Sequence, residues 1–193
     1  MALFTGKGDD GTTKTFACDQ RRSKNSAVSE ALGTVDELNA FLGLVKLRAE
    51  TFPENKILEK SFVQIVDEVQ QNLFIVQAEL AGSPSLKIVE EKVHEVENFI
   101  NTAEKEMPPI KNFFVSGGTE MAATFDFART ISRRAERRVI AAHETGDPKM
   151  SQFSLAYLNR LSSLLYALAR LSNFRAGISE DKPRYEQRGE ILI

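Results

Sequence analysis

The sequence predicts an all-α protein, a five-helix bundle in a single domain that covers residues 1–193. Apolar residues recur every three or four positions along five segments, the spacing that lines one face of a helix. No segment alternates apolar and polar residues with the period of two that marks a half-buried strand. Glycine and proline clusters separate the segments, and a hydrophobic content of 42% in 193 residues suffices for one core.

The first three helices are expected between clear boundary signals. The apolar spacing predicts the first helix over 26–50. The pattern Thr51-Phe-Pro-Glu54 has the form of a capping box with proline in the first turn, so the second helix is expected to begin there and to reach about Ala81. The third helix is expected over about 86–106, because Met107-Pro-Pro109 ends it.

The fourth and fifth helices are longer. The fourth is expected over about 119–144, and the fifth over about 149–174, with Asp147 as its N-cap and Pro148 in the first helical position. The fifth helix is apolar nearly all round, which predicts that it is buried centrally or at a subunit interface. These helices complete the bundle of residues 26–174, and residues 175–193 are expected to form a mobile tail.

An arginine-rich segment of the fourth helix carries the strongest functional signal. Arg129, Arg133 and Arg137 are four residues apart and form a row along one face, with Glu136 nearby. Guanidinium groups can bind phosphate oxygens with two hydrogen bonds at once, and a row of like charges favours an anion between them. The alternative is a solvated surface on which Glu136 pairs with neighbouring arginines.

The glycine-rich segment from Gly6 to Gly11 gives a second signal, within the polar residues 1–25. Glycines let backbone N–H groups converge on an anion, although a plain turn is the alternative. The segment differs from a Walker A motif because Thr12 and Thr13 stand where lysine and serine or threonine would follow. Nearby candidates for phosphate and Mg²⁺ contacts are Lys7, Lys14, Lys24, Asp9 and Asp10.

Other polar and aromatic positions leave two interpretations open. Asn159 interrupts the apolar fifth helix, either as a helix–helix hydrogen bond or as a ligand contact. Phe113 and Phe114 form either a packing plug or the wall of a cofactor site. His94 and His143 lack acidic or cysteine companions at ligand spacing, so no residue is predicted to be a structural metal ligand.

Composition restricts the classes of partner and location. A formal net charge of −2 argues against general nucleic-acid binding, which needs a broad basic surface. No apolar run is long enough to cross a bilayer, and the N-terminus lacks the apolar region of a signal peptide. The single Cys18 excludes an intrachain disulfide, so a cytoplasmic location is expected.

Six segments together resemble the PduO-type ATP:corrinoid adenosyltransferase family. In chain order they are Thr5-Gly-Lys-Gly-Asp-Asp-Gly-Thr-Thr13, Arg22-Ser-Lys24, Gly33-Thr-Val-Asp-Glu-Leu-Asn39, Phe113-Phe-Val-Ser-Gly-Gly118, Ala128-Arg-Thr-Ile-Ser-Arg-Arg-Ala-Glu-Arg-Arg138 and Tyr157-Leu-Asn-Arg-Leu-Ser162. The resemblance implies a trimeric five-helix bundle with active sites between subunits. It also implies transfer of the 5′-deoxyadenosyl group of ATP to the cobalt of a reduced corrinoid such as cobalamin, releasing triphosphate.

The resemblance also implies roles for individual residues. Triphosphate contacts from one subunit would come from Thr5, Gly6, Lys7, Gly8, Thr13, Lys14 and Lys24. ATP contacts from the next subunit would come from Arg133, Glu136, Arg137 and Asn159. Asp36 and Arg129 would form a salt bridge between subunits beside the corrinoid, and Phe113 would help to expel the lower cobalt ligand. Mg²⁺, a corrinoid reductase and an adenosylcobalamin-dependent client enzyme are expected partners.

The sequence departs from the family pattern at two positions and leaves two other functions open. Ser116 stands where proline usually precedes the glycine pair, and Ser163 stands where aspartate is common. We expect activity to survive both departures. The alternatives are a protein that carries adenosylcobalamin to a client with little turnover, and a structural helical oligomer whose arginines make salt bridges between subunits.

Overall fold

Five helices account for most of the chain in the computed structural model, which describes residues 3–15, 21–52 and 55–185. The helices are α1 (Ala27–Glu50), α2 (Phe62–Leu80), α3 (Glu90–Glu106), α4 (Glu120–Glu144) and α5 (Gln152–Arg175). Two short antiparallel hairpins pair β1 (Thr12–Thr13) with β2 (Arg22–Ser23) and β3 (Lys56–Ile57) with β4 (Lys60–Ser61). The predicted five-helix architecture is confirmed.

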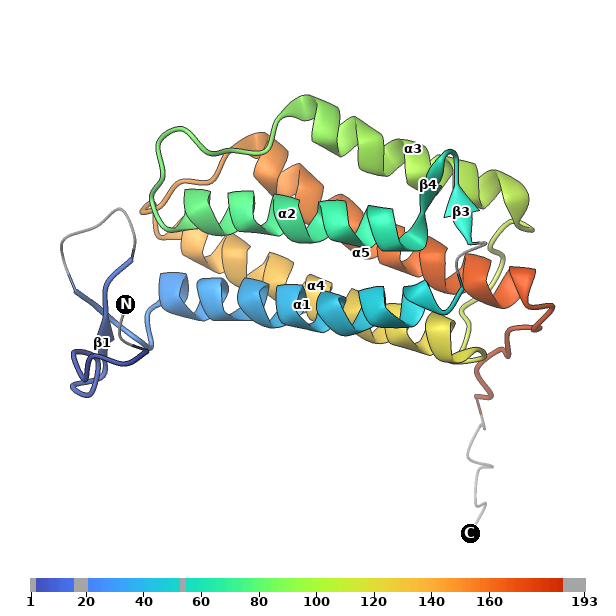
Figure 1. Cartoon of the computed structure of the whole chain (residues 1–193), viewed down its shortest axis with the longest axis horizontal. Helices are drawn as coiled ribbons and strands as arrows, with labels where there is room; N and C mark the ends of the chain where they lie inside the picture. Colours follow the sequence, from blue (N-terminus) through green and yellow to red (C-terminus); the bar gives the residue numbers. More distant parts are fainter. Residues whose placement is uncertain (1–2, 16–20, 53–54, 186–193) are drawn as a thin grey trace, which may run out of the picture.

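The helices run side by side around one apolar core (Figure 1). α4 packs against both α1 and α5, α2 packs on α1, and α3 packs on α5. α5 therefore lies between α3 and α4, and residues on most of its circumference are buried. Of the two locations predicted for its apolar surface, a central position within the chain is the one found. Among the described residues, no helix has the length and hydropathy needed to cross a membrane.

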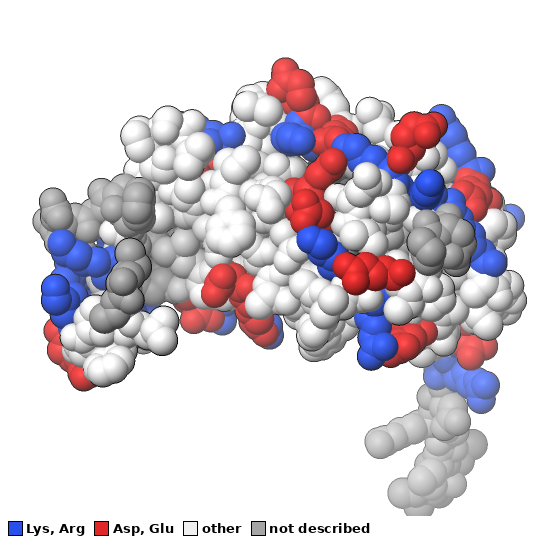
Figure 2. All heavy atoms as spheres, viewed as in Figure 1, with Lys and Arg blue, Asp and Glu red and all other residues white. Residues whose placement is uncertain are grey.

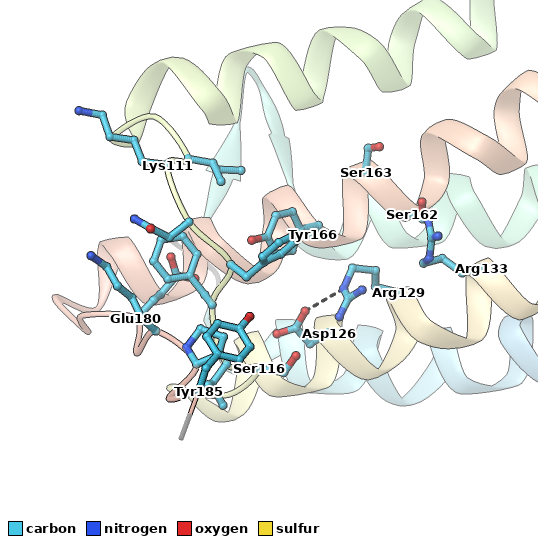
Figure 3. Close-up of a pocket in the computed structure, with 17 residues that line it drawn as sticks. Lys111, Ser116, Asp126, Arg129, Arg133, Ser162, Ser163, Tyr166, Glu180 and Tyr185 are labelled. Carbon is cyan, nitrogen blue, oxygen red and sulfur yellow. Dashed lines mark hydrogen bonds and ion pairs between the residues drawn. The ribbon is translucent and has the colours of Figure 1, made fainter. Parts of the chain in front are cut away.

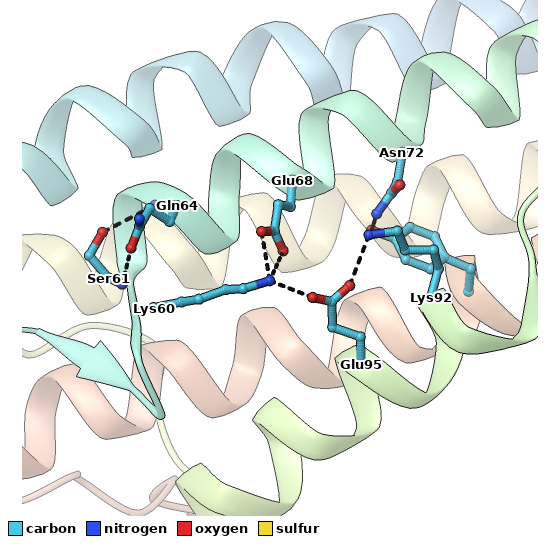
Figure 4. Close-up of polar contacts among 8 residues, drawn as sticks. Lys60, Ser61, Gln64, Glu68, Asn72, Lys92 and Glu95 are labelled. Carbon is cyan, nitrogen blue, oxygen red and sulfur yellow. Dashed lines mark hydrogen bonds and ion pairs between the residues drawn. The ribbon is translucent and has the colours of Figure 1, made fainter.

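The predicted start of the second helix is wrong. Thr51 ends α1, because its N–H donates to the carbonyl of Arg48, and α2 begins only at Phe62. The capping box lies at Ser61, whose hydroxyl accepts from the Gln64 N–H at 3.2 Å while the Gln64 side chain accepts from the Ser61 N–H at 2.8 Å (Figure 4). The β3–β4 hairpin lies between Thr51 and α2, and the complete capping box at Ser61, ten residues after the predicted one, starts the helix.

The predicted N-cap of the fifth helix is also wrong, and α3 begins at Glu90 rather than near 86. Ser151 caps α5. The Asp147 carboxylate instead accepts from the Arg22 guanidinium at 2.6 Å, which joins β2 to the connection between α4 and α5. The buried Glu79 at the end of α2 accepts from the Ser151 N–H at 2.7 Å, so a tertiary contact selects the start of the helix.

Residues 176–185 follow α5 and contact the segment between α3 and α4. The Val115 N–H donates to the Asp181 carbonyl at 2.8 Å. The predicted mobility of 175–193 stays a prediction, and residues 186–193 and Cys18 lie outside the described residues. Figure 2 shows charges of both signs interspersed on one face, with basic side chains gathered over the N-terminal segment.

Candidate functional site

A pocket of about 910 Å³ opens between α4, α5 and the segment 110–116 (Figure 3). Arg129 and Arg133 form its cationic side, one helical turn apart on α4. Phe113 contributes to its apolar side, and Tyr166 of α5 lies between the two sides. The pocket therefore suits a ligand that has both an anionic and an extended apolar part.

Arg129 is held in place by two neighbours within the pocket. Its Nε donates to Oδ1 of the mostly buried Asp126 at 2.9 Å. Its Cζ lies 5.7 Å from the centre of the Tyr166 ring. Burial raises the pKa of Tyr166, so this side chain stays a neutral hydroxyl at physiological pH. Arg133 is exposed at the neighbouring position and is available to an incoming anion.

The segment that carries Phe113 is anchored at its end by Asn173 of α5. The Asn173 Oδ1 accepts from the Thr119 N–H at 2.9 Å, and its Nδ2 donates to the Gly117 carbonyl at 2.8 Å. Gly118 adopts a φ of +95°, which favours glycine. Phe113 itself is 80% exposed. Sequence reasoning missed Asn173, although a buried asparagine in the last turn of an apolar helix is a signal for such a contact.

The arginines of α4 divide between two faces. Arg134 donates to Glu37 at 2.5 Å, and Arg138 lies 3.4 Å from Glu30, so both bind α1. Arg129 and Arg133 face the pocket instead. Of the predicted row, Arg129 and Arg133 line the pocket, whereas Arg137 does not.

Glu136 of α4 and Asn159 of α5 connect these two helices, and neither residue lines the pocket. The Asn159 Nδ2 donates to Oε1 of Glu136 at 2.8 Å, which joins α5 to α4. The Asn159 Oδ1 accepts from Arg160 at 2.6 Å. One of the two alternatives for Asn159, a helix–helix hydrogen bond, is present, and the residue is exposed.

The glycine-rich N-terminal segment forms a compact turn. The Lys24 ammonium donates to the Gly8 carbonyl at 2.8 Å, and Gly6 and Gly11 adopt positive φ values of 68° and 78°. The Asp10 carboxylate accepts from the Thr12 hydroxyl at 2.7 Å. This hydrogen bond is the largest cause of a lowered pKa of Asp10. Thr5, Lys7, Thr13 and Lys14 lie on the same segment, at its exposed or half-buried surface.

The chain matches one protein family by sequence and by fold. The family described as cobalamin adenosyltransferase matches residues 3–172. The chain belongs to this family. It is 37% identical over 182 residues to the corrinoid adenosyltransferase PduO of Citrobacter freundii, covering 91% of this chain and 51% of that protein. It is 37% identical over 183 residues to the corrinoid adenosyltransferase of Bacillus subtilis, covering 93% and 91%.

A solved structure of the same family gives the match in three dimensions. A variant of the PduO-type ATP:corrinoid adenosyltransferase from Lactobacillus reuteri, complexed with cobalamin and ATP, superimposes with a TM-score of 0.82. The two are 30% identical, and the match covers 95% of this chain and 97% of that one. The chain spans about half the length of the PduO relatives from Citrobacter freundii and Salmonella typhimurium.

Within this adenosyltransferase-family chain, the structure brings some predicted site residues together and separates others. Phe113, Arg129 and Arg133 share the pocket, as do the two departures from the family pattern, Ser116 and Ser163. The N-terminal segment lies at the end of the bundle where α1 begins, whereas the pocket opens toward the end where α5 finishes (Figures 1 and 3).

Asp36 and Arg129 have different partners within the single chain. The Asp36 carboxylate accepts from the Gln77 side chain at 3.4 Å, and Arg129 pairs with Asp126. The resemblance places the Asp36–Arg129 pair between subunits, so this pairing stays a prediction. Across the described residues there is no group of three or more His, Cys, Asp or Glu side chains placed to hold a metal ion.

Proposed function

We propose that the chain transfers the 5′-deoxyadenosyl group of ATP to the cobalt of a reduced corrinoid and releases triphosphate. The observation that carries this proposal is the single pocket that combines Arg129 and Arg133 with Phe113. Its support is the fold match to a relative complexed with cobalamin and ATP. In the transfer, a cobalt–carbon bond forms as the C5′–oxygen bond breaks. Cobalt(I) supplies the electron pair, and triphosphate leaves with the pair from the broken bond.

Arg133 is the residue to which we assign stabilisation of the departing triphosphate. Reduced cobalt is already a strong nucleophile, so the protein needs no general base and acts by positioning and by charge stabilisation. Arg137 continues the cationic row, and the Glu136–Asn159 hydrogen bond holds α4 and α5 together beside it. We assign ATP binding to these four residues.

The N-terminal segment would bind the triphosphate from a neighbouring subunit. Its support is the separation between this segment and the pocket within one chain (Figure 1). Thr5, Gly6, Lys7, Gly8, Thr13, Lys14 and Lys24 would supply backbone amides, hydroxyls and ammonium groups to the phosphates. Lys24 already lies against the Gly8 carbonyl, so its charge is placed at the turn before ATP arrives.

Phe113 would act on the corrinoid side of the pocket. Its ring is largely exposed at the pocket wall, where an apolar wedge excludes both water and the lower cobalt ligand. Loss of that ligand makes reduction of cob(II)alamin easier. Asp36 and Arg129 would pair across the subunit boundary beside it, with Arg129 already oriented by Asp126.

Mg²⁺ fits this site as a companion of ATP. Mg²⁺ is commonly held by one or two carboxylates together with substrate phosphates. The described residues have no cluster of three or more candidate ligands, and Asp9 offers an exposed carboxylate on the N-terminal turn. When bound, the ion would neutralise phosphate charge, while Lys24 and Arg133 would orient the triphosphate.

We also propose a homotrimer that works with a corrinoid reductase and an adenosylcobalamin-dependent client enzyme in the cytoplasm. Self-association is supported by large apolar side chains that are more than half exposed on α1 and α4, namely Leu44, Leu47 and Phe127. Light scattering on the purified chain tests the trimer, and a mass of one chain contradicts it.

A spectrophotometric assay tests the reaction. Chemically reduced cobalamin, Mg²⁺ and ATP are mixed with the protein, and loss of cob(I)alamin absorbance is followed together with triphosphate release. Equal amounts of adenosylcobalamin and triphosphate support the transferase. ATP binding without triphosphate release favours the carrier, and absence of both favours the structural oligomer.

A further inference from the structure

We propose that Arg170 and Glu180 position the segment that carries Phe113, and that this pair controls how efficiently the lower ligand of cob(II)alamin is displaced. The inference rests on the proposed function. Neither residue is assigned contact with the reacting atoms, so both are positioning residues. Arg170 belongs to α5, and Glu180 belongs to the segment 176–185 that follows it.

The pair is a nearly enclosed contact between these two elements. The Arg170 Nε donates to Oε2 of Glu180 at 2.9 Å, and the side chains are only 9% and 15% exposed. Most ion pairs among the described residues are more open, for example Arg134 with Glu37 at 45% and 53%. Removal of one partner of an enclosed pair leaves the other charge desolvated and uncompensated, so the segment cannot keep its position without cost.

The same guanidinium also contacts the segment 110–116. The Arg170 Cζ lies 5.2 Å from the centre of the Phe114 ring, within the range of a cation–π contact. Phe114 is half-buried, whereas the adjacent Phe113 is exposed in the pocket. Arg170 therefore joins three elements, and the orientation of Phe113 depends on an anchor one residue away.

A backbone hydrogen bond links the same two segments directly. The Val115 N–H donates to the Asp181 carbonyl at 2.8 Å, next to Glu180 in the chain. The start of the segment 176–185 is held to α5, because the Ile178 N–H donates to the Asn173 carbonyl at 2.9 Å. Glu180 and the residues on either side of Val115 line the pocket (Figure 3). A change at Glu180 therefore reaches the pocket wall through a short, continuous set of contacts.

The test compares Glu180→Gln with Glu106→Gln. Glu106 makes a two-pronged pair with Arg175, also on α5, with two contacts of 2.7 Å, and neither residue lines the pocket. Each variant thus loses one carboxylate, and the arginine partners of both carboxylates lie on α5. Hydrogen exchange of residues 110–116 is measured first. Adenosylation is then measured from preformed cob(I)alamin and from cob(II)alamin with a reductant.

We expect Glu180→Gln to speed exchange of the Val115 amide by about tenfold or more, because the segment that accepts its hydrogen bond is released. Adenosylation from cob(II)alamin should fall by a similar factor with an unchanged KM for ATP. Transfer to cob(I)alamin, whose lower ligand has already left, should stay within about twofold. Glu180→Asp should recover part of the loss, and Glu106→Gln should match the wild type in all three measurements.

Equal behaviour of Glu180→Gln and Glu106→Gln in exchange and in cob(II)alamin use overturns the proposal. So does an equal loss with both cobalamin states. Failure of the wild-type protein to transfer refutes the proposed function instead, and the exchange measurement still decides whether the pair holds the segment. If Glu180→Gln lacks a cooperative thermal transition, Glu180→Asp takes its place, because its shorter side chain weakens the contact with Arg170. Wild-type exchange of 110–116 in Glu180→Asp then overturns the proposal.

Discussion

Gly118 lies so close to Asn173 that a Cβ added to this glycine would be 2.4 Å from the Asn173 Oδ1. The same amide oxygen accepts the Thr119 N–H that starts α4, and the amide nitrogen binds Gly117. The end of α5 thus fixes the point where the Phe113 segment enters α4. The contact that holds the start of α4 therefore also holds the end of the segment 110–116, which lines the pocket.

Gly118→Ala should destabilise the protein by about 1–3 kcal/mol, because the new Cβ clashes and the φ of +95° is strained for alanine. Urea unfolding measures the change in the free energy of unfolding. Gly43→Ala, in the middle of α1, is the control. Its new Cβ would lie 3.8 Å from the Gln70 side chain, an ordinary contact, so this substitution should stabilise the protein by about 0.5–1 kcal/mol. Equal stability of the two variants would contradict the role of Asn173.

Arg133→Ala should lower kcat/KM for ATP by the equivalent of about 2.7–4 kcal/mol, the loss typical of one donor to developing charge. Steady-state kinetics with cob(I)alamin measures it. Arg134→Ala is the matched control on the same helix, because its guanidinium faces α1 and pairs with Glu37 at the surface. Unchanged turnover in a folded Arg133→Ala protein would remove Arg133 from the site.

Phe113→Ala should spare ATP binding and reduce adenosylation that starts from cob(II)alamin, because the ring is exposed at the part of the pocket that we propose binds the corrinoid. ATP binding is measured by calorimetry, and product formation by absorbance. Phe74→Ala serves as the control, since this ring is 61% exposed on α2 and lies outside the pocket. A selective loss of ATP binding in Phe113→Ala is the result that contradicts the assignment.

Glu95 should give the protein an acid-sensitive part of its stability. Burial by itself would raise the pKa of Glu95, but hydrogen bonds from Lys60 and Lys92 outweigh it and hold the pKa below its ordinary value of 4.5 (Figure 4). The Lys92 ammonium lies 3.0 Å from Oε2 of Glu95. A carboxyl group with a lowered pKa in the folded state stabilises fully above its unfolded pKa, and the contribution is lost as pH falls through the folded value.

Glu95→Gln should therefore cost roughly 1–2 kcal/mol at pH 7 and flatten the decline of stability below about pH 4.5. Both effects are measured by urea unfolding between about pH 3 and pH 7, a range that spans the ordinary carboxyl pKa values. Glu90→Gln is the control, because Glu90 is 60% exposed and lies 3.7 Å from the His94 ring. An unchanged acid slope in Glu95→Gln would show that the contacts of Glu95 with Lys60 and Lys92 do not contribute to the stability of the folded protein.

Sequence reasoning identified the helices better than their first residues. The apolar spacing of α1 and α4 predicted both to within one residue at each end. The starts of α2 and α5 were missed because several capping patterns compete locally, and packing selects among them. At α5, the buried Glu79 accepts from Ser151, a residue 72 positions away.

Some features of the candidate site were also predicted from the sequence, and others were missed. The arginine row, the glycine-rich turn and the Phe113 segment were recognisable because charge, glycine content and helical spacing are local properties. Asn173 and the Arg170–Glu180 pair were missed, because an isolated polar residue in an apolar helix does not reveal its partner. The hydrogen bonds of Asn173 to Thr119 and Gly117 exist only after α5 packs beside the start of α4, and that of Arg170 to Glu180 only after the chain turns back beyond α5.

The amino-acid sequence by itself determined that the chain is helical, where its charge is concentrated and which residue types can meet an anion. These properties depend on neighbours within a turn or two. Only the tertiary structure decided that Arg133 faces the pocket while Arg134, one residue on, binds α1. A rotation of about 100° per residue separates the two directions, and packing of α4 between α1 and α5 determines which direction faces open space.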